Sequence, residues 1–274
     1  MTHRTPSTGT VLDSIIEGVI EDMDARKADI PLSRIQQRAE EAAPARDAHA
    51  ALQGGRDNAA GVGIIAEVKR ASPSAGPLAN IESPAELAAQ YAAGGAAAIS
   101  VLTEQRRFHG SLEDFDAVRA RVDIPVLRKD FTVDEYQIYE ARAHGADLVL
   151  LIVAALDDAQ LRDYLALTHE LGMHALVETH TLEEIERATA VDASIVGINV
   201  RNLKTLDVDT SHYGTLAEHL PENVVRVAES GVKQASDVAM YASQGADAVL
   251  VGEALVKHGE PKQAIADFRK ASRS

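Results

Sequence analysis

Cysteine is absent from the 274 residues of this chain, and its absence removes several kinds of chemistry at once. Without a thiol the protein can form no disulfide, no thiolate metal site and no cysteine nucleophile. The chain also lacks an apolar run of about 18 residues, the length that a membrane-spanning helix needs. Its first residues, MTHRTPSTGT, lack the apolar core of a signal peptide. We therefore expect a cytoplasmic protein that has no membrane-embedded segment.

Positive charge is scarce, because 27 Lys and Arg stand against 42 Asp and Glu, for a formal net charge of -15. A polyanion would be repelled at long range by such a surface, which argues against general nucleic-acid binding. A small anion is a different case, since a few cations in a pocket dominate the local field. The composition therefore disfavours a nucleic-acid partner and permits a small anionic substrate.

Three common patterns of functional sites are missing as well. The histidines show no paired spacing typical of metal ligands, and no nucleophile elbow surrounds a serine. No Gly-x-Gly-x-x-Gly opens a first helix. We therefore expect no metal, no hydrolase triad and no nicotinamide cofactor.

What the chain does contain is a repeated pattern of helix, glycine and apolar run. The pattern occurs as YAAGGAAAISVL at 91–102, RAHGADLVLLIV at 142–153 and ASQGADAVLVG at 242–252. Glycine suits the left-handed end of a helix, and the apolar run that follows is typical of a strand buried on both faces. The repetition predicts parallel βα units.

Eight apolar runs are strand candidates, and helical stretches such as 135–142, 159–171 and 182–190 separate them. The strands are expected at 64–68, 97–102, 125–128, 148–153, 175–178, 195–200, 224–228 and 248–251. Eight alternating units favour an α/β fold with a single closed (β/α)8 TIM barrel. The structural alternative is an open, doubly wound sheet.

The residues before the first strand are expected to form a helical extension. Apolar residues from Val11 to Met23 follow the i, i+3/i+4 spacing of an amphipathic helix, and such a continuous apolar face should pack on the barrel. A second, Ala-rich helix is expected at 32–52, with a joining loop at 54–60. The predicted organisation is an extension at 1–60 and one barrel at 61–274.

Polar residues follow the predicted strands, at the end of the barrel where enzymes of this fold carry their active sites. Because residues i and i+2 of a strand point to the same side, Glu67 should point with Lys69, and Asn199 with Arg201. Taken singly, each is explained by a loop charge, a structural ion pair or a turn cap. Polar side chains at five different strand ends favour one shared site: Lys69, Lys129, Glu178, Asn199 and Arg201.

Glycines after the last two strands indicate a phosphate site. Ser230-Gly231 follows the seventh strand and Gly252-Glu253 follows the eighth, where barrels often hold phosphate with backbone N–H groups. Glycine also lets the backbone approach a ligand closely. A Ser-Pro-Ser loop that begins at Ser72 adds hydroxyl groups and can cover a ligand.

Seven segments resemble indole-3-glycerol phosphate synthases. They are IAEVKRASPS (65–74), LTEQRRFHGSLEDF (102–115), VLRKDFTVDEYQIYEARAHGADLVLLI (126–152), LVETHTLEE (176–184), GINVRNLKTLDVD (197–209), AESGV (228–232) and GADAVLVGEALV (245–256). The likeness runs from around Ile15 to the last helix and covers every strand end. Related phosphate-binding barrels share the glycines of strands seven and eight, but not EVKRxSPS together with LRKDF.

The resemblance implies a cofactor-free carboxy-lyase of tryptophan biosynthesis, with other enzymes of that aromatic amino acid pathway as partners. It would convert 1-(2-carboxyphenylamino)-1-deoxyribulose 5-phosphate into indole-3-glycerol phosphate, carbon dioxide and water. The implied catalytic residues are Glu67, Lys69, Lys129, Glu178, Asn199 and Ser230. The implied substrate-binding and phosphate-binding residues are Ser72, Arg201, Glu229, Gly231, Gly252 and Glu253.

Two positions depart from the pattern of many members. Val200 stands where many have Asn, and alternation should point it away from the site; Ala75 stands where many have Lys and removes a loop cation.

The chemistry of ring closure suits these residue types. A lysine has an ordinary pKa of about 10.4, so it is protonated at neutral pH and can donate a proton to a carbonyl. A carboxylate can accept a proton, and an amide can orient hydroxyl groups. Spacing leaves open whether Lys129 or Lys69 gives the first proton. We favour Lys129, with Lys69 assisting the substrate carboxylate and the loss of water.

Three alternatives use the same barrel. A phosphoribosylanthranilate isomerase would need a paired Asp and Cys, and the chain has no Cys. A Schiff-base aldolase would bond covalently to its substrate through Lys129, which borohydride would trap. A phospholigand-binding barrel without catalysis should have lost some charged strand ends, yet all of them remain.

Overall fold

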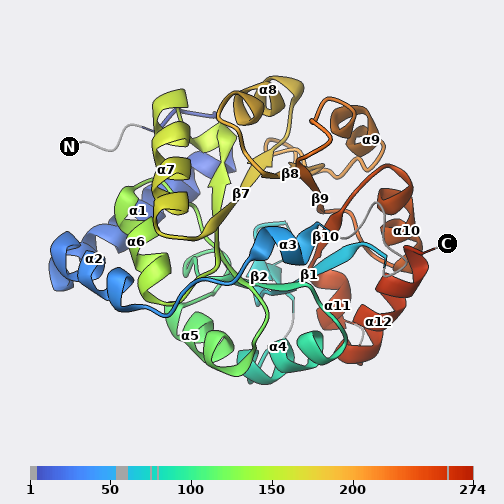
Figure 1. Ribbon diagram of the computed structural model, residues 1–274, viewed down its shortest axis with the longest axis horizontal. Helices are drawn as coiled ribbons and strands as arrows, with labels where there is room; N and C mark the ends of the chain where they lie inside the picture. The colour runs from blue at the N-terminus through green and yellow to red at the C-terminus, as the bar shows by residue number, and fades with distance from the viewer. Residues whose placement is uncertain (1–4, 54–60, 75, 79, 258, 274) are drawn as a thin grey trace.

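The centre of the molecule is a closed barrel of eight parallel strands, in the order β1-β10-β9-β8-β7-β6-β5-β4 (Figure 1). The strands are β1 (Gly63–Val68), β4 (Ala98–Leu102), β5 (Val126–Lys129), β6 (Leu148–Ile152), β7 (His174–Thr179), β8 (Ile195–Asn199), β9 (Val225–Glu229) and β10 (Ala248–Val251). The computed structural model describes residues 5–53, 61–74, 76–78, 80–257 and 259–273. The predicted joining loop at 54–60 and Ala75 lie outside this part of the chain. The barrel predicted from the eight apolar runs is confirmed.

Helices alternate with the strands and form the outer ring of the barrel (Figure 1). They are α4 (Pro84–Ala93), α5 (Leu112–Arg121), α6 (Glu135–Ala143), α7 (Asp158–Glu170), α8 (Leu182–Ala190), α9 (His212–Ala217), α10 (Ala235–Ser243) and α12 (Pro261–Ala271). Short elements follow three strands: hairpin β2 (Ala71–Ser72) with β3 (Gly76–Pro77), turn η1 (Val153–Ala155) and helix α11 (Glu253–Lys257). In the described part of the chain, no helix combines the length and the apolar character needed to cross a membrane.

The repeated glycines follow the ends of helices and adopt the left-handed backbone conformation. Gly95, Gly145 and Gly245 have φ angles of 92°, 79° and 85°, a region that side chains with a Cβ rarely adopt. Each glycine turns the chain from the end of a helix into the next buried strand. The pattern seen in the sequence is therefore the structural unit of the barrel.

Because successive side chains of a strand point to opposite sides, each strand contributes to two separate apolar clusters, one outside the barrel and one inside it. In β1, Ile64 and Ala66 pack outward against the helical ring, whereas Ile65 packs inside the barrel. The inward side of β1 continues through Glu67, which is only 2% exposed. The period of two that buries the apolar residues therefore also aims the polar residue at the strand end into the barrel mouth.

The N-terminal extension covers the barrel at both of its ends. Helix α1 (Val11–Asp29) buries Leu12 and Ile16 in the inner apolar cluster, and the short helix α3 (Ala48–Leu52) adds Ala48 and Leu52 to the same cluster. Figure 1 places α3 over the middle of the barrel. Because the two helices fill the barrel from different ends, the extension contributes to the barrel core directly.

The single helix expected at 32–52 is wrong in its extent. The structure has α2 (Leu32–Glu41) and α3, with extended backbone at Ala42, where ψ is 144°. Pro44 explains the break, because a proline lacks an N–H and disfavours helical backbone in the residue before it. A new helix starts where the Asp47 side chain accepts a hydrogen bond from the backbone N–H of Ala50.

Candidate active site

A cavity of about 850 Å³ lies at the carboxyl ends of the strands. The structure brings every residue that the sequence assigned to the site to the wall of this one cavity. These residues are Glu67, Lys69, Ser72, Lys129, Glu178, Asn199, Arg201, Glu229, Ser230, Gly231, Gly252 and Glu253. They come from strands on opposite sides of the barrel, which face one another only because the sheet is closed.

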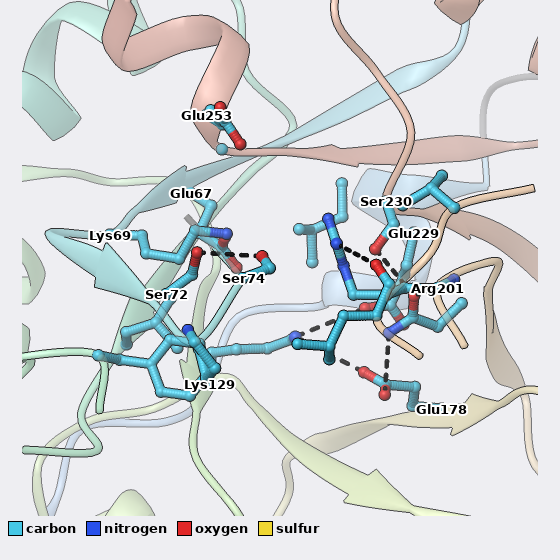
Figure 2. Close-up of a pocket in the computed structure, with 18 of the residues that line it drawn as sticks. Glu67, Lys69, Ser72, Ser74, Lys129, Glu178, Arg201, Glu229, Ser230 and Glu253 are labelled. Atoms are coloured by element: carbon cyan, nitrogen blue, oxygen red, sulfur yellow. Dashed lines mark hydrogen bonds and ion pairs between the residues drawn. The ribbon is translucent and has the colours of Figure 1, made fainter. Parts of the chain in front are cut away.

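Lys129, the last residue of β5, extends its ammonium group between two carboxylates (Figure 2). Its Nζ lies 3.6 Å from Oε2 of Glu178 and 3.5 Å from Oε2 of Glu229. Burial by itself would lower the pKa of Lys129, but the charges of Glu178, Glu229 and Glu67 raise it above its ordinary value. Lys129 is therefore a cation throughout the neutral range.

Asn199 connects three neighbouring strand ends through its side-chain amide. Its Nδ2 donates a hydrogen bond of 3.2 Å to Oε1 of Glu178. Its Oδ1 accepts one of 2.8 Å from Oγ of Ser230 and one of 3.1 Å from the backbone N–H of Arg201. Both ends of the amide are thus engaged, which fixes its orientation and that of the Glu178 carboxylate.

The two carboxylates beside Lys129 differ in pKa. The pKa of Glu178 is lowered, because the charges of Lys129 and His180 outweigh the effect of burial. Burial and the neighbouring charge of Glu178 instead raise the pKa of Glu229 well above its ordinary value. Glu178 is therefore the stronger acid of the two and the carboxylate that is ionised at neutral pH, and Glu229 is the weaker acid.

Gly197 makes room for the Glu229 side chain. It stands in β8 opposite Glu178 in the ladder, and a Cβ built at Gly197 would collide with Oε1 of Glu229. That oxygen is buried and has no hydrogen-bond partner among the described residues, so no donor there stabilises a negative charge on Glu229. A glycine inside a strand often marks such a close approach.

Glu67 and Lys69 form a second charged pair across the cavity from Glu178 (Figure 2). Oε1 of Glu67 lies 2.5 Å from Nζ of Lys69, and the charges of Lys69 and Lys129 outweigh burial and lower the pKa of Glu67. A Cβ at Gly252 would come within 2.7 Å of the same carboxylate oxygen. Gly252, which the sequence assigned to phosphate binding, therefore also leaves space for this pair.

The turn after β9 enters the cavity with unusual backbone. Ser230 and Gly231 have φ angles of 69° and 82°, and a left-handed serine is uncommon and costs energy. The Tyr241 hydroxyl donates a hydrogen bond of 3.0 Å to the Ser230 carbonyl and holds the turn. This turn is what aims the Ser230 hydroxyl at Asn199.

The remaining predicted residues lie at the rim. Arg201 donates a hydrogen bond of 2.8 Å to the carbonyl of Leu206, so it fastens its own loop as well as lining the cavity. The hydroxyl of Ser72 lies 3.3 Å from that of Ser74. Glu253 begins α11 and stands apart from the Lys129 cluster (Figure 2).

An apolar wall of the cavity was missed by the sequence interpretation. Its members are Val11, Leu12 and Ile15 of α1 together with Phe108, Phe131, Leu150, Ile152 and Leu203. The rings of Phe108 and Phe131 lie 5.8 Å apart, centroid to centroid. The apolar stripe of α1 was the available signal, but it indicated only packing. Three charged wall residues, Asp130, Asp207 and Lys233, were also not assigned to the site.

Metal binding has no cluster to support it in the described part of the chain. No group of three His, Asp or Glu side chains is arranged there to hold an ion.

A model of the indole-3-glycerol phosphate synthase family matches residues 12–268. The chain belongs to this family. The indole-3-glycerol phosphate synthase of Micrococcus luteus is 64% identical over 263 residues, which are 96% of this chain and 98% of that protein. The one of Mycolicibacterium smegmatis is 60% identical over 262 residues, 96% of this chain and 94% of that protein. Indole-3-glycerol phosphate synthases are carboxy-lyases of tryptophan biosynthesis, and the chain is an enzyme of this class that acts on a small phosphorylated substrate.

Solved structures with a similar barrel are more distant in sequence. A 3-hexulose-6-phosphate synthase has a TM-score of 0.62 and 20% identity, covering 77% of this chain and 99% of its own. A thiamine phosphate pyrophosphorylase from Pyrococcus furiosus has a TM-score of 0.58 and 17% identity, covering 77% and 95%. At these identities the likeness shows the fold alone.

Proposed function

We propose that the protein closes the indole ring of indole-3-glycerol phosphate. The substrate is 1-(2-carboxyphenylamino)-1-deoxyribulose 5-phosphate, and the other products are carbon dioxide and water. The observation that carries the proposal is the Lys129 ammonium, held 3.6 Å and 3.5 Å from two buried carboxylates in a cavity with an apolar wall. The wall suits an aromatic ring, and the fixed cation suits a carbonyl oxygen on which negative charge develops.

In the first step Lys129 gives its proton to the substrate carbonyl oxygen. The ring carbon that carries the carboxylate then bonds to the carbonyl carbon, and the aromaticity of the ring is lost. Lys129 suits this role because Glu178 and Glu229 hold its ammonium in place before the substrate binds. A donor that needs no rearrangement acts at little reorganisation cost.

In the second step the substrate carboxylate leaves as carbon dioxide. Its bonding electrons return to the ring, where the positively charged nitrogen accepts the density, and aromaticity is restored. Lys69 faces this carboxylate in the proposal, because Glu67 holds its Nζ on the opposite side of the cavity from Glu178. The lysine thereby orients the leaving group.

In the third step water leaves and the indole forms. Lys69 protonates the departing hydroxyl group, and Glu178 removes a proton from the carbon next to the nitrogen. Glu178 is suited to be the base because its pKa is lowered by Lys129, so the carboxylate is ionised at neutral pH. Asn199 and Ser230 orient the sugar hydroxyls through the hydrogen bonds that join them.

The phosphate is placed at the turns after β9 and β10. Gly231 and Gly252 line the cavity together, and glycine allows a phosphate to approach backbone N–H groups. Arg201 and Ser72 contact the sugar phosphate from the neighbouring rim, and Lys233 adds a cation from the turn after β9. The proposal also places the enzyme in the cytoplasm, beside other enzymes of the tryptophan pathway.

The test is direct observation of the product. The purified protein is incubated with the carboxyphenylamino substrate, and indole fluorescence is followed with and without a chelator. Appearance of the product at equal rates in both samples is expected. Folded protein that forms no indole product would overturn the proposal, and a borohydride-trapped adduct on Lys129 would favour a Schiff-base mechanism.

A further inference from the structure

His180 lies directly beyond the end of β7 and beside Glu178, but it does not line the cavity. Its side chain is 9% exposed, and its Nε2 lies 3.4 Å from Oε1 of Glu178. Nε2 has no hydrogen-bond partner among the described residues, so its contact with Glu178 is an ion pair that is not aligned as a hydrogen bond. Such contacts of catalytic groups are often long before substrate binds.

The other side of the imidazole is held by a second carboxylate, Glu184. Oε2 of Glu184 lies 3.2 Å from Nδ1 of His180 and accepts the backbone N–H of His180 at 2.7 Å. Glu184 is itself fixed by the start of α8, where Thr181 is the N-cap and accepts the Glu184 N–H at 3.2 Å. The beginning of the helix therefore sets the position of the imidazole ring.

Both ring nitrogens of His180 face carboxylate oxygens. A carboxylate only accepts hydrogen bonds, and only a protonated imidazole has a donor on each nitrogen. The arrangement Glu184–His180–Glu178 therefore suits an imidazolium with a negative charge on either side. Asn199 donates to the same oxygen of Glu178, so its amide and the His180 ring both face Oε1 while Oε2 faces Lys129.

We propose that His180 is a positioning residue for the reaction, held by Glu184 as an imidazolium that keeps Glu178 ionised and oriented toward the substrate. The inference rests on the proposed function, because it assigns to Glu178 the removal of a substrate proton. His180 acts through Glu178 and does not touch the substrate. The pair places an oriented cation next to the base on the side that the substrate does not occupy.

Three charged groups act on the imidazole, from β7, α8 and β5. Burial lowers the pKa of His180, but the hydrogen bond to Glu184 and the charges of Glu178 and Glu184 raise it, against the opposing charge of Lys129. The net direction is upward, so the imidazolium persists to higher pH than in a free histidine. Loss of this cation should raise the pKa of Glu178, because an opposite charge nearby lowers the pKa of a carboxyl.

The test is His180→Gln, which keeps a side-chain donor near Glu178 but cannot carry a charge. The measurements are kcat and KM as functions of pH, from the fluorescence of the indole product. We expect kcat at neutral pH to fall about tenfold, because Glu178 loses an oriented contact with a charged group, and the acidic limb of the kcat profile to move up by about one pH unit. KM should change less than kcat, because His180 is not part of the cavity wall.

Two further variants make the test specific. Glu184→Gln leaves the imidazole in place but removes a negative charge that stabilises its protonated form. The acidic limb of the kcat profile should therefore move in the same direction as in His180→Gln, but by less. His174→Gln is the matched control, because His174 starts the same strand and its Nε2 lies 3.4 Å from a carboxylate oxygen of Asp47. Its pH profile should coincide with that of the wild type.

An acidic limb that stays in place in folded His180→Gln would overturn the inference, since His180 would then only anchor the start of α8. Circular dichroism establishes folding, and Glu184→Gln decides the question if His180→Gln does not fold. Wild-type protein that forms no indole product would instead overturn the proposed function. The two failures are therefore distinguishable.

Discussion

Gly197→Ala should impair catalysis without adding any polar group to the site. The new methyl group would occupy the space of Oε1 of Glu229 and would come within 3.2 Å of Cδ1 of Leu176. Glu229 is only 2% exposed, so its carboxyl can move only by giving up its place beside Lys129. A single methyl group inside a strand should therefore disturb the proposed proton donor.

The magnitude follows from the contact that is lost. Nζ of Lys129 lies 3.5 Å from Oε2 of Glu229, and a hydrogen bond to a charged group contributes about 1.5–3 kcal/mol. If the whole contact is lost from the transition state, kcat/KM should fall about 10- to 150-fold. The overpacked methyl should also lower the free energy of unfolding by about 1–3 kcal/mol.

The assay is the fluorescence of the indole product, with circular dichroism and urea unfolding to measure stability. Gly63→Ala is the matched control, because Gly63 also lies in a barrel strand and its new Cβ would meet the methyl groups of Ala248 and Ala97 at 3.4 Å, an ordinary contact. Gly63→Ala should keep wild-type kcat/KM. Equal activity of folded Gly197→Ala and wild type would refute the role assigned to the Glu229 carboxyl.

Other predictions concern the base, the acid and the attachment of α1. Lys129→Met and Glu178→Gln should each lower kcat about 100-fold or more with the fold retained; near-normal turnover in either variant would remove that residue from the mechanism. Arg26→Ala should lower the free energy of unfolding in urea by about 1–3 kcal/mol, because Nε of Arg26 lies 2.7 Å from the buried Glu140 carboxylate. Arg121→Ala, which breaks an ion pair exposed on both sides, should cost less than about 0.5 kcal/mol, and equal costs would contradict the reasoning.

The positions of the strands could be predicted because periodicity and glycine carry that information locally. The glycine at the end of each helix and the apolar run after it are neighbours in the chain, so no distant contact is needed to interpret them. The Ala-rich composition of residues 32–52 favours one helix, whereas Pro44 within this stretch breaks it into two. Local rules therefore gave the barrel and, applied more strictly, would also have given the helix break.

The residues that make up the site could be predicted for a geometric reason. A closed parallel barrel brings the carboxyl ends of all its strands to one rim, so polar residues at strand ends meet there whatever their distance in sequence. Lys129 and Glu178 are an example, as are Asn199 and Ser230. Knowing the strand ends was enough to know which residues would be close.

The protonation of these groups depended on the folded structure. Glu178 and Glu229 are the same residue type at the ends of β7 and β9, the strands on either side of β8, yet the pKa of one is lowered and that of the other is raised. The difference arises because Glu178 faces a second cation, His180, and accepts a hydrogen bond from Asn199, whereas Oε1 of Glu229 lies against Gly197 in a space without a donor. Distances of a few ångströms in a low dielectric decide such shifts, and sequence spacing does not contain them.

The sequence by itself determined the alternation of strands and helices, the inward side of each strand and the rim on which the polar residues gather. Only the tertiary structure decided what covers that rim. The apolar face of α1 was evident from its spacing, but an amphipathic stripe says that a surface will be buried and not against which partner. Val11, Leu12 and Ile15 became part of the cavity wall, because the closed barrel gathers distant apolar residues such as Phe131 and Leu203 at the cluster in which Leu12 is buried.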